Sequence, residues 1–384
     1  MKPAHLLLTL ALGTGLQACE RDSSSWNGAV VRDSAGVEIV EIRASVPRSR
    51  FTLSEQPLLE IGGLSGDPAS ELYNVSGGVR FADGRIVIAN AGTQELKVFD
   101  SAGHHVRTVG REGEGPGEFL GINWIGLHAA DSILTYDRTQ NRIQVFDRNL
   151  ELGRVTVLQA PSDLGFGGLA AVCAFPDGSL LARGPELVLE YPRQALQRHV
   201  FRFSPEGIPV DSIGPFRGGR EIWMSGEPWP PFERKAAFVV HGESFYTAAS
   251  DLDEFRRISQ DGDLERIVRG GHEPQPVTEE DIANALEGRP PMGIGEPWIA
   301  PTLPLWSEFV VDDEGAVWRR AYPRRGDERV LWTVVSGVGE MIAEVETPLN
   351  LRLLHVGSDF ILAVRRDTLD VEYVVLLGLK RSDD

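Results

Sequence analysis

The chain has 384 residues, of which 42% are hydrophobic and 24% charged, as in an ordinary globular protein. A chain of this length buries enough apolar surface to fold without disulfide bonds. Its net charge of −18 argues against a general nucleic-acid-binding protein, because neutralising phosphates requires a basic surface. No nucleic-acid partner is therefore predicted.

The N-terminal residues carry a secretion pattern. The apolar run Leu6–Leu16 is too short for a permanent bilayer-spanning helix, which needs about 20 residues, but has the length of a signal-peptide core. It ends in Leu16-Gln17-Ala18-Cys19, which resembles the lipobox of bacterial lipoproteins. The resemblance implies removal of residues 1–18, diacylation of Cys19, and a polar tether with an N-terminal segment over residues 19–50. The alternative is plain secretion, with Cys19 left unmodified.

Residues 51–384 are organised by a repeat and are predicted to form one domain. Asp83-Gly84 and Val98-Phe99-Asp100 recur, the second as Val145-Phe146-Asp147, which places Phe146 47 residues after Phe99. Weaker copies follow, and the markers of all the units are Gly84, Asp131, Gly178, Gly242, Gly315 and Gly357. The markers are spaced by about 47, 47, 64, 73 and 42 residues. A period in the 40s with short alternating strands is typical of propeller blades of four strands each.

Two segments carry a family resemblance. Asp137–Asp147 resembles the core of an NHL repeat, with Gln140 at the place where that repeat has Asn. Gly113–Phe119 resembles the connector between NHL blades. The chain as a whole resembles the bacterial six-bladed propeller lipoproteins with degenerate NHL-like repeats, most strongly over residues 57–160. The resemblance implies an all-β, six-bladed propeller, but no activity.

The repeat register also predicts how the ring closes. Pro57–Gly62 parallels Val106–Gly110, a fourth strand, while the last unit, residues 351–379, lacks its fourth strand. Pairing the two would close the ring and leave no open edge. Gly28–Ile42 then lies outside this closure, as a short hairpin across residues 33–36. A short helix is predicted inside an insertion, at Thr278–Leu286, where Thr278 is an N-cap followed by acids.

No motif for catalysis or metal binding is found in the sequence, and no cofactor is predicted. Cys173 lies in an apolar run and is interpreted as a buried, inert thiol rather than a nucleophile. The His104-His105 pair falls in a hairpin turn and is interpreted as solvated rather than metal-binding. Asn90 and Asp137, at the ends of second strands, are interpreted as caps of their own turns.

Strand direction predicts where a ligand binds. The connectors between blades share one face with the turns between second and third strands, and two of them are enlarged, at 216–238 and 272–309. These insertions are rich in tryptophan and proline, and the central channel opens on the same face. The predicted ligand-binding residues are Asn123, Trp124, Trp223, Trp229, Glu233, Arg234, Trp298, Trp306 and Arg352. Alternatively, the tryptophans only anchor the long loops.

These observations predict a membrane-tethered, extracytoplasmic binding propeller, whose partner is a protein, a peptide or a small molecule held on the connector face. The alternative is a metal-dependent hydrolase or lyase working in the channel. Six-bladed lactonase-like hydrolases hold a metal there with Glu, Asn and Asp, and Glu233 and Asn123 match part of that set.

Overall fold

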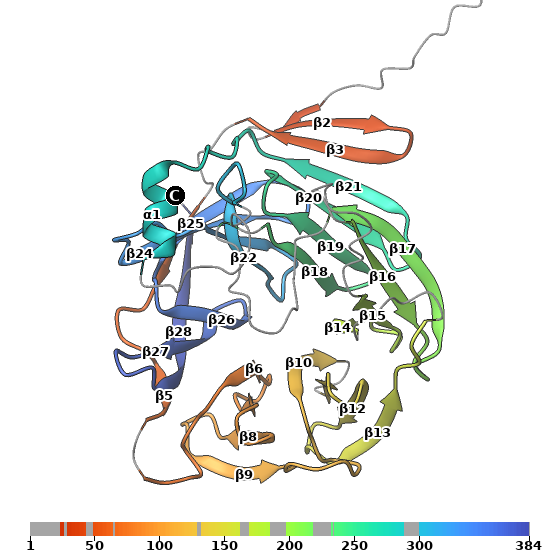
Figure 1. Ribbon diagram of the computed structural model, residues 1–384, viewed down its shortest axis with the longest axis vertical. Coiled ribbons are helices and arrows are strands. Elements are labelled where there is room, and N and C mark those ends of the chain that lie inside the picture. Colours follow the sequence, from red (N-terminus) through yellow and green to blue (C-terminus); the bar gives the residue numbers. More distant parts are fainter. Residues whose placement is uncertain are drawn as a thin grey trace, which may run out of the picture.

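The computed structural model describes residues 24–26, 29–43, 49–63, 66–128, 132–161, 169–184, 197–217, 232, 234–287 and 299–383. Six sheets stand around a central axis, and each contributes one blade of antiparallel strands (Figure 1). Each blade runs outwards from the axis in chain order, so that its first strand lines the centre and its fourth lies at the rim. The predicted six-bladed propeller with four-stranded blades is confirmed.

The strands follow one another blade by blade. Blade one has β6 (Val75–Arg80), β7 (Ile86–Asn90), β8 (Glu95–Phe99) and β9 (His105–Val109); blade two has β10 (Ile122–His128), β11 (Ser132–Asp137), β12 (Arg142–Phe146) and β13 (Leu152–Val157). Blade three has β14 (Ala170–Ala174), β15 (Leu180–Arg183), β16 (Gln197–Phe203) and β17 (Pro209–Arg217); blade four has β18 (Ala236–His241), β19 (Ser244–Ala249), β20 (Glu254–Ser259) and β21 (Leu264–Arg269). Blade five has β22 (Trp306–Val311), β23 (Val317–Ala321), β24 (Arg329–Val335) and β25 (Met341–Pro348); blade six has β26 (Leu351–Val356), β27 (Phe360–Arg366) and β28 (Glu372–Asp383).

The residue pattern of each strand follows its place in the blade. Every residue of the second strand β7 is buried, because neighbouring blades cover both of its faces. The rim strand β9 instead alternates between half-buried and exposed residues, as a strand with one solvated face does. Gly84 and Gly315 turn the chain from first to second strand at φ values of +89° and +82°, which only glycine adopts readily.

Hydrophobic clusters join neighbouring blades into a ring. Between blades one and two, Phe119 and Phe146 are both buried in one such cluster. Between blades five and six, Trp318 and Trp332 lie with ring centroids 6.5 Å apart and are fully buried. Similar clusters fill the other interfaces, so each blade depends on its neighbours to bury its faces.

The N-terminal closure predicted from the repeat register is confirmed. Strand β5 (Leu59–Gly62) pairs antiparallel with β28 as the fourth strand of blade six, with Ile61 opposite Val374. A preceding strand, β4 (Ser49–Leu53), pairs with the end of the same β28, with Leu53 opposite Leu379. The closure therefore uses two N-terminal strands, one more than the repeat register predicts.

The predicted hairpin across residues 33–36 is also confirmed. Strands β2 (Ala29–Ser34) and β3 (Val37–Ile42) pair antiparallel, and Ala35 and Gly36 both have positive φ, as in a type I′ turn. The attachment of this hairpin was not predicted. Strand β3 pairs in parallel with β21, so the hairpin and the short β1 (Ser24–Trp26) extend the rim of blade four (Figure 1).

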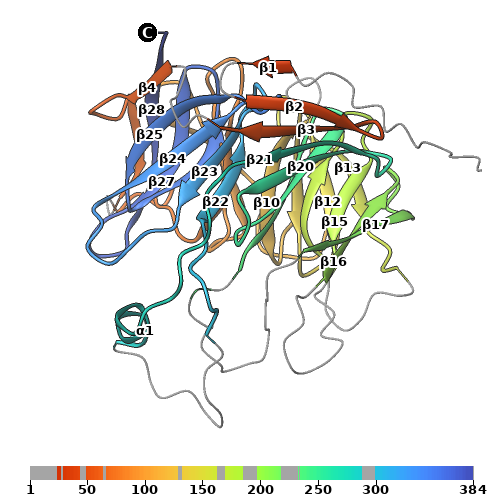
Figure 2. The same cartoon turned by 90° about the horizontal axis from the view of Figure 1, so that it is seen from above.

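The predicted helix is present as α1 (Glu279–Leu286), with Thr278 as its N-cap and Asp281 completing a capping box. Its residues Ile282 and Ala285 pack against a small cluster formed by Phe232, Ala300 and Leu303. Figure 2 shows α1 on one side of the ring, with β4 and the C-terminus on the opposite side. We call the side that bears α1 the connector face, and the opposite side the turn face.

Candidate functional site: a cleft between blades four and five

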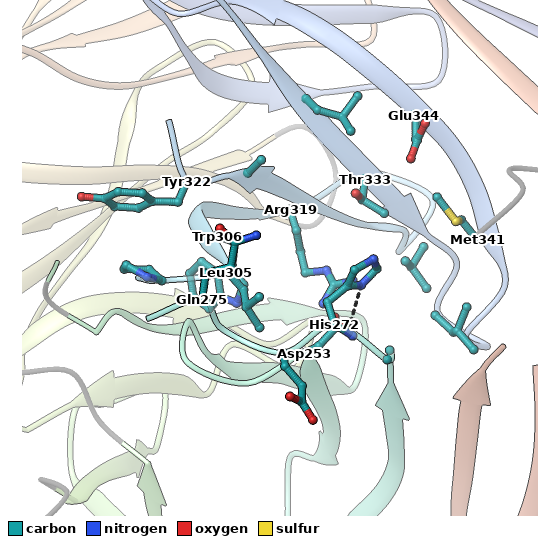
Figure 3. Close-up of a pocket in the computed structure, with 18 of the residues that line it drawn as sticks. Asp253, His272, Gln275, Leu305, Trp306, Arg319, Tyr322, Thr333, Met341 and Glu344 are labelled. Atoms are coloured by element: carbon teal, nitrogen blue, oxygen red, sulfur yellow. Dashed lines mark hydrogen bonds and ion pairs between the residues drawn. The ribbon is translucent and has the colours of Figure 1, made fainter. Parts of the chain in front are cut away.

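A cleft of about 530 Å³ opens between blades four and five, at the connector face (Figure 3). Both ends of the connector that carries α1 line it, with residues 270–275 on one side and 303–306 on the other. Blade five contributes residues from β23, β24 and β25, and the end of the N-terminal hairpin contributes Ile42 and Arg43. A volume in the range of about 300–1,000 Å³ is typical of small-molecule sites.

A buried ion pair joins the two blades at the cleft. Asp253, in the turn between β19 and β20, accepts a hydrogen bond from Nη1 of Arg319 in β23 at 2.5 Å. Only 7% of the Asp253 side chain and 12% of the Arg319 side chain are exposed. The pair is therefore shielded from solvent, and it fixes the distance between the two walls.

His272 completes the set around Asp253. Its backbone N–H and its Nδ1 lie 3.0 Å and 2.8 Å from Oδ2 of the carboxylate, and its imidazole is exposed. Gly270 allows this approach, because a Cβ at that position would collide with the Asp253 carboxylate. Burial raises the pKa of Asp253, but the charge of Arg319 and the hydrogen bonds from His272 outweigh it and hold that pKa below its ordinary value.

The blade-five wall is mainly apolar. Leu331, Thr333 and Val335 alternate along β24 and line the cleft, as residues two apart in a strand share a face. Glu344 of β25 lies opposite Thr333 in the strand register, is half-buried, and also lines the cleft. Within the described residues, no hydrogen bond or ion pair reaches the Glu344 carboxylate.

Trp306 forms the inner part of the cleft. The residue is only 3% exposed, and the centroids of its ring and of the Phe309 ring lie 5.7 Å apart. Its indole N–H has no hydrogen-bond partner among the residues that the structure describes. A buried donor without a partner is uncommon in folded proteins.

The structure describes five of the nine residues predicted to bind a ligand. Asn123 is exposed on β10, and Trp124 is half-buried against the cluster between blades two and three. Arg234 forms an ion pair with Asp251 at 2.7 Å, and Arg352 donates a hydrogen bond from Nη2 to the Val75 carbonyl. The other four, Trp223, Trp229, Glu233 and Trp298, lie outside the described residues, as does Cys19.

Of the five described residues, Trp306 alone lines the cleft. The sequence reasoning identified the enlarged connector at 272–309, but it missed Asp253, Arg319 and Glu344. Asp253 lies in a turn of blade four and Arg319 in a strand of blade five, so no spacing in the sequence relates them. The polar residues between the apolar positions of the strands could have indicated Thr333 and Glu344.

Asn90 and Asp137 act as caps, as interpreted from the sequence. Asn90 accepts a hydrogen bond from the Tyr73 N–H at 2.7 Å and donates to Thr93 in its own turn. Asp137 accepts from the Leu120 N–H at 2.7 Å and from the Gln140 N–H at 3.0 Å. Each side chain thus ties the incoming connector to the blade.

The structure also describes His104 and Cys173, which the sequence analysis interpreted as a solvated turn residue and an inert thiol. His104 is exposed in the turn after β8, as predicted. Cys173 is half-buried in β14, its Sγ lies 3.7 Å from the Phe238 carbonyl oxygen, and burial raises the pKa of its thiol. A raised thiol pKa lowers the fraction of reactive thiolate.

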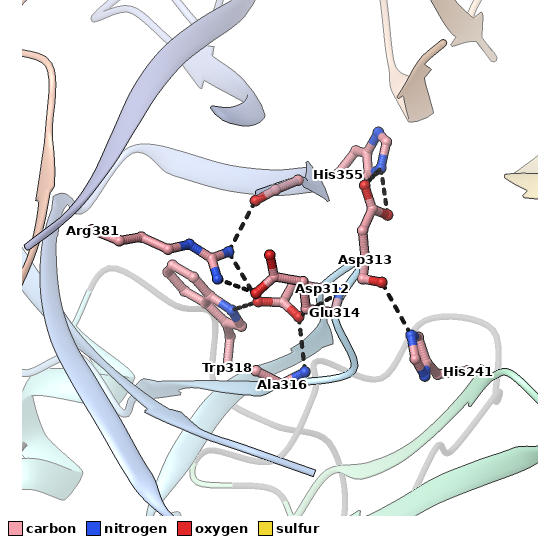
Figure 4. Close-up of polar contacts among 9 residues, drawn as sticks. His241, Asp312, Asp313, Glu314, Ala316, Trp318, His355 and Arg381 are labelled. Carbon is pink, nitrogen blue, oxygen red and sulfur yellow. Dashed lines mark hydrogen bonds and ion pairs between the residues drawn. The ribbon is translucent and has the colours of Figure 1, made fainter. Parts of the chain in front are cut away.

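A polar network spans the turn face at the inner ends of blades four, five and six (Figure 4). His355 accepts the Arg80 N–H at Nδ1, 3.1 Å away, and its Nε2 lies 2.9 Å from Oδ1 of Asp313. The buried Asp312 accepts the Trp318 indole N–H at 2.9 Å; burial raises the pKa of Asp312 above its usual value despite this bond. These bonds stay within the protein and hold the first-to-second-strand turn of blade five against its neighbours.

The described residues contain no group of three or more His, Cys, Asp and Glu side chains arranged to hold a metal ion. Nor do they include a helix with the length and apolar character needed to cross a bilayer.

Comparisons with known proteins agree with this architecture. A family model described as a 6-bladed beta-propeller (DUF5128) matches residues 70–158. The chain is a six-bladed β-propeller. No curated protein matches it.

Solved structures similar to this propeller include two bacterial proteins. The first, described as an exported protein from Bacteroides fragilis, is 13% identical, with 89% of this chain and 98% of that chain covered at a TM-score of 0.51. The second, a member of the DUF4221 family from Bacteroides vulgatus, is 11% identical, with 88% and 100% covered at a TM-score of 0.53. At such identities the similarity shows the fold alone.

Proposed function

We propose that this propeller is a membrane-tethered, extracytoplasmic binding protein that takes a small ligand on its connector face, in the cleft between blades four and five. The observation that carries the proposal is the cleft itself, which is lined by both ends of the enlarged connector. Ordered insertions on a rigid scaffold are where binding sites concentrate. A rigid ion pair, an apolar wall and a few polar groups are what small-molecule sites combine.

Filling the cleft tests this function. Thr333→Tyr places a large ring in the cleft, and tyrosine suits a strand, so the fold should be retained. We expect the wild-type protein, incubated with the small-molecule fraction of a cell extract, to retain a bound mass in native mass spectrometry. Thr333→Tyr should lose that mass with little change in melting temperature.

The matched control is His104→Ala, an exposed position in a turn on the opposite face, which should keep the bound mass. A mass retained equally by Thr333→Tyr and the wild-type protein would place binding elsewhere. No bound mass in any of the three proteins would count against the proposed binding function.

The tether is tested separately. Because Leu16-Gln17-Ala18-Cys19 matches a lipobox, Cys19→Ser should abolish labelling by a radioactive fatty acid and release the protein into the soluble fraction. Unchanged membrane association of this variant would refute the lipid anchor, while leaving the cleft and its ligand untouched.

A further inference from the structure

We propose that the ligand of this cleft is a small amine, with an apolar body and a protonated amino group that pairs with Glu344. This inference rests on the proposed binding function and names the chemical class of the ligand. It follows from the charges inside the cleft and from the chemistry of its walls.

Three arginines line the cleft, and each has a carboxylate partner in the protein. Arg319 is paired with the buried Asp253, and Arg324 pairs with Asp281 of α1 at 3.2 Å while donating to Gln275 at 2.7 Å. Arg43 is exposed and lies 3.8 Å from Glu41. An anionic ligand would compete with these carboxylates, although Nε of Arg319 has no hydrogen-bond partner among the described residues.

Glu344, by contrast, is a charged residue whose side chain has no partner among the described residues. It lines the cleft from β25, is half-buried, and its carboxylate has no hydrogen bond or ion pair in the described part of the chain. Half-burial weakens the solvation of a carboxylate, so a cation beside it is favoured. The net charge of −18 adds a general attraction for cations over the whole molecule.

The surroundings of Glu344 require that the rest of the ligand be apolar. Val335 and Met341 flank the same wall, and Leu303 and Leu305 face the cleft from the connector. Figure 3 shows Glu344, Thr333 and Met341 on one side and Asp253 and His272 on the other. A small hydrated metal ion would leave these apolar surfaces exposed, whereas an apolar amine covers them.

A ligand in the cleft can also exclude water from the Glu344 carboxylate. Exclusion of water strengthens an ion pair formed inside the cleft.

Three probes that share one apolar body test the inference: 4-phenylbutylamine, 4-phenylbutanol and 4-phenylbutanoate. Binding to the full chain is measured by isothermal titration calorimetry at pH 7. We expect the amine to bind at least about tenfold more tightly than the alcohol, and the carboxylate to bind most weakly, because a tenfold change corresponds to about 1.4 kcal/mol.

Glu344→Gln keeps the shape of the side chain and removes its charge. The variant should weaken amine binding by about tenfold and leave alcohol binding unchanged. The control is Glu346→Gln, two residues along the same strand, where the carboxylate is exposed and already paired with Arg329 at 3.3 Å. This control should bind the amine as the wild-type protein does.

The outcomes separate the ligand class from the binding function. Equal amine affinity in Glu344→Gln and the wild-type protein, or tighter binding of the carboxylate, overturns the amine inference. If Thr333→Tyr still loses its bound mass in native mass spectrometry, the binding function stands with a ligand of another class. Absence of binding by all three probes also overturns the amine inference.

Discussion

A chain that begins at residue 66 is expected to aggregate or to unfold, because it lacks both strands that close the ring. Strand β28 would then expose an edge over Tyr373–Leu376 and Leu379–Asp383, where β5 and β4 now pair. Open edges of this kind recruit other chains. Size-exclusion chromatography and circular dichroism of the truncated chain measure the effect.

Two point variants test how much the packing of β5 contributes to stability. Ile61 is 3% exposed, in the cluster between blades six and one, so Ile61→Ala should lower the free energy of unfolding by about 2–5 kcal/mol. Leu58, three residues earlier, is 65% exposed, and Leu58→Ala should change the free energy of unfolding by no more than about 0.5 kcal/mol. Urea titrations compare the two.

The control truncation removes residues 20–28, which leaves β2, β3, β4 and β5 in place. It should keep the melting temperature of the full chain to within a few degrees. Equal stability of this truncation and of the chain that begins at residue 66 would contradict the closing role of β4 and β5.

The second large effect is expected at the ion pair between blades four and five. Asp253→Ala leaves Arg319 buried without its partner and should lower the free energy of unfolding by about 3–5 kcal/mol. The double variant Asp253→Ala/Arg319→Met removes the stranded charge and should recover much of that loss. With the single variant Arg319→Met and the wild-type protein, the four proteins form a double-mutant cycle, in which unfolding free energies are measured by denaturant titration.

His272→Ala is the control at the same carboxylate. The imidazole is 75% exposed, so its contact with Asp253 should contribute only about 0–1 kcal/mol. If His272→Ala lowered the free energy of unfolding as much as Asp253→Ala does, the conformation of the connector, rather than the stranded Arg319 charge, would account for the loss of stability.

The same carboxylate gives a pH dependence with a defined sign. The pKa of Asp253 is lowered in the folded protein, so the folded state binds this proton less readily than the unfolded chain does. The stabilisation is complete above the unfolded pKa of about 3.9 and is lost as the pH falls through the lower folded pKa. The difference in unfolding free energy between the wild-type protein and Asp253→Asn should therefore shrink below about pH 4.

The sequence by itself determined the number of blades and one of the two strands that close the ring. Four of the markers, Gly84, Gly178, Gly242 and Gly315, recur because their blades need a turn between the first and second strands, and glycine supplies the positive φ that the turn requires. The same register identified Pro57–Gly62 as a fourth strand without three preceding strands of its own, which therefore completes the last blade. The helix at Thr278 followed from its capping residues alone. These features are local, or they repeat, and a sequence displays both kinds directly.

Only the tertiary structure decided where the N-terminal hairpin lies and which residues line the cleft. Strand β3 joins blade four through a parallel pairing with β21, more than 200 residues away, and its end brings Ile42 and Arg43 to the cleft. Asp253 comes from a turn of blade four, whereas Arg319 and Glu344 come from two strands of blade five. No repeat or periodicity records such neighbours, because the contact between two blades depends on their packing rather than on the spacing of residues along the chain.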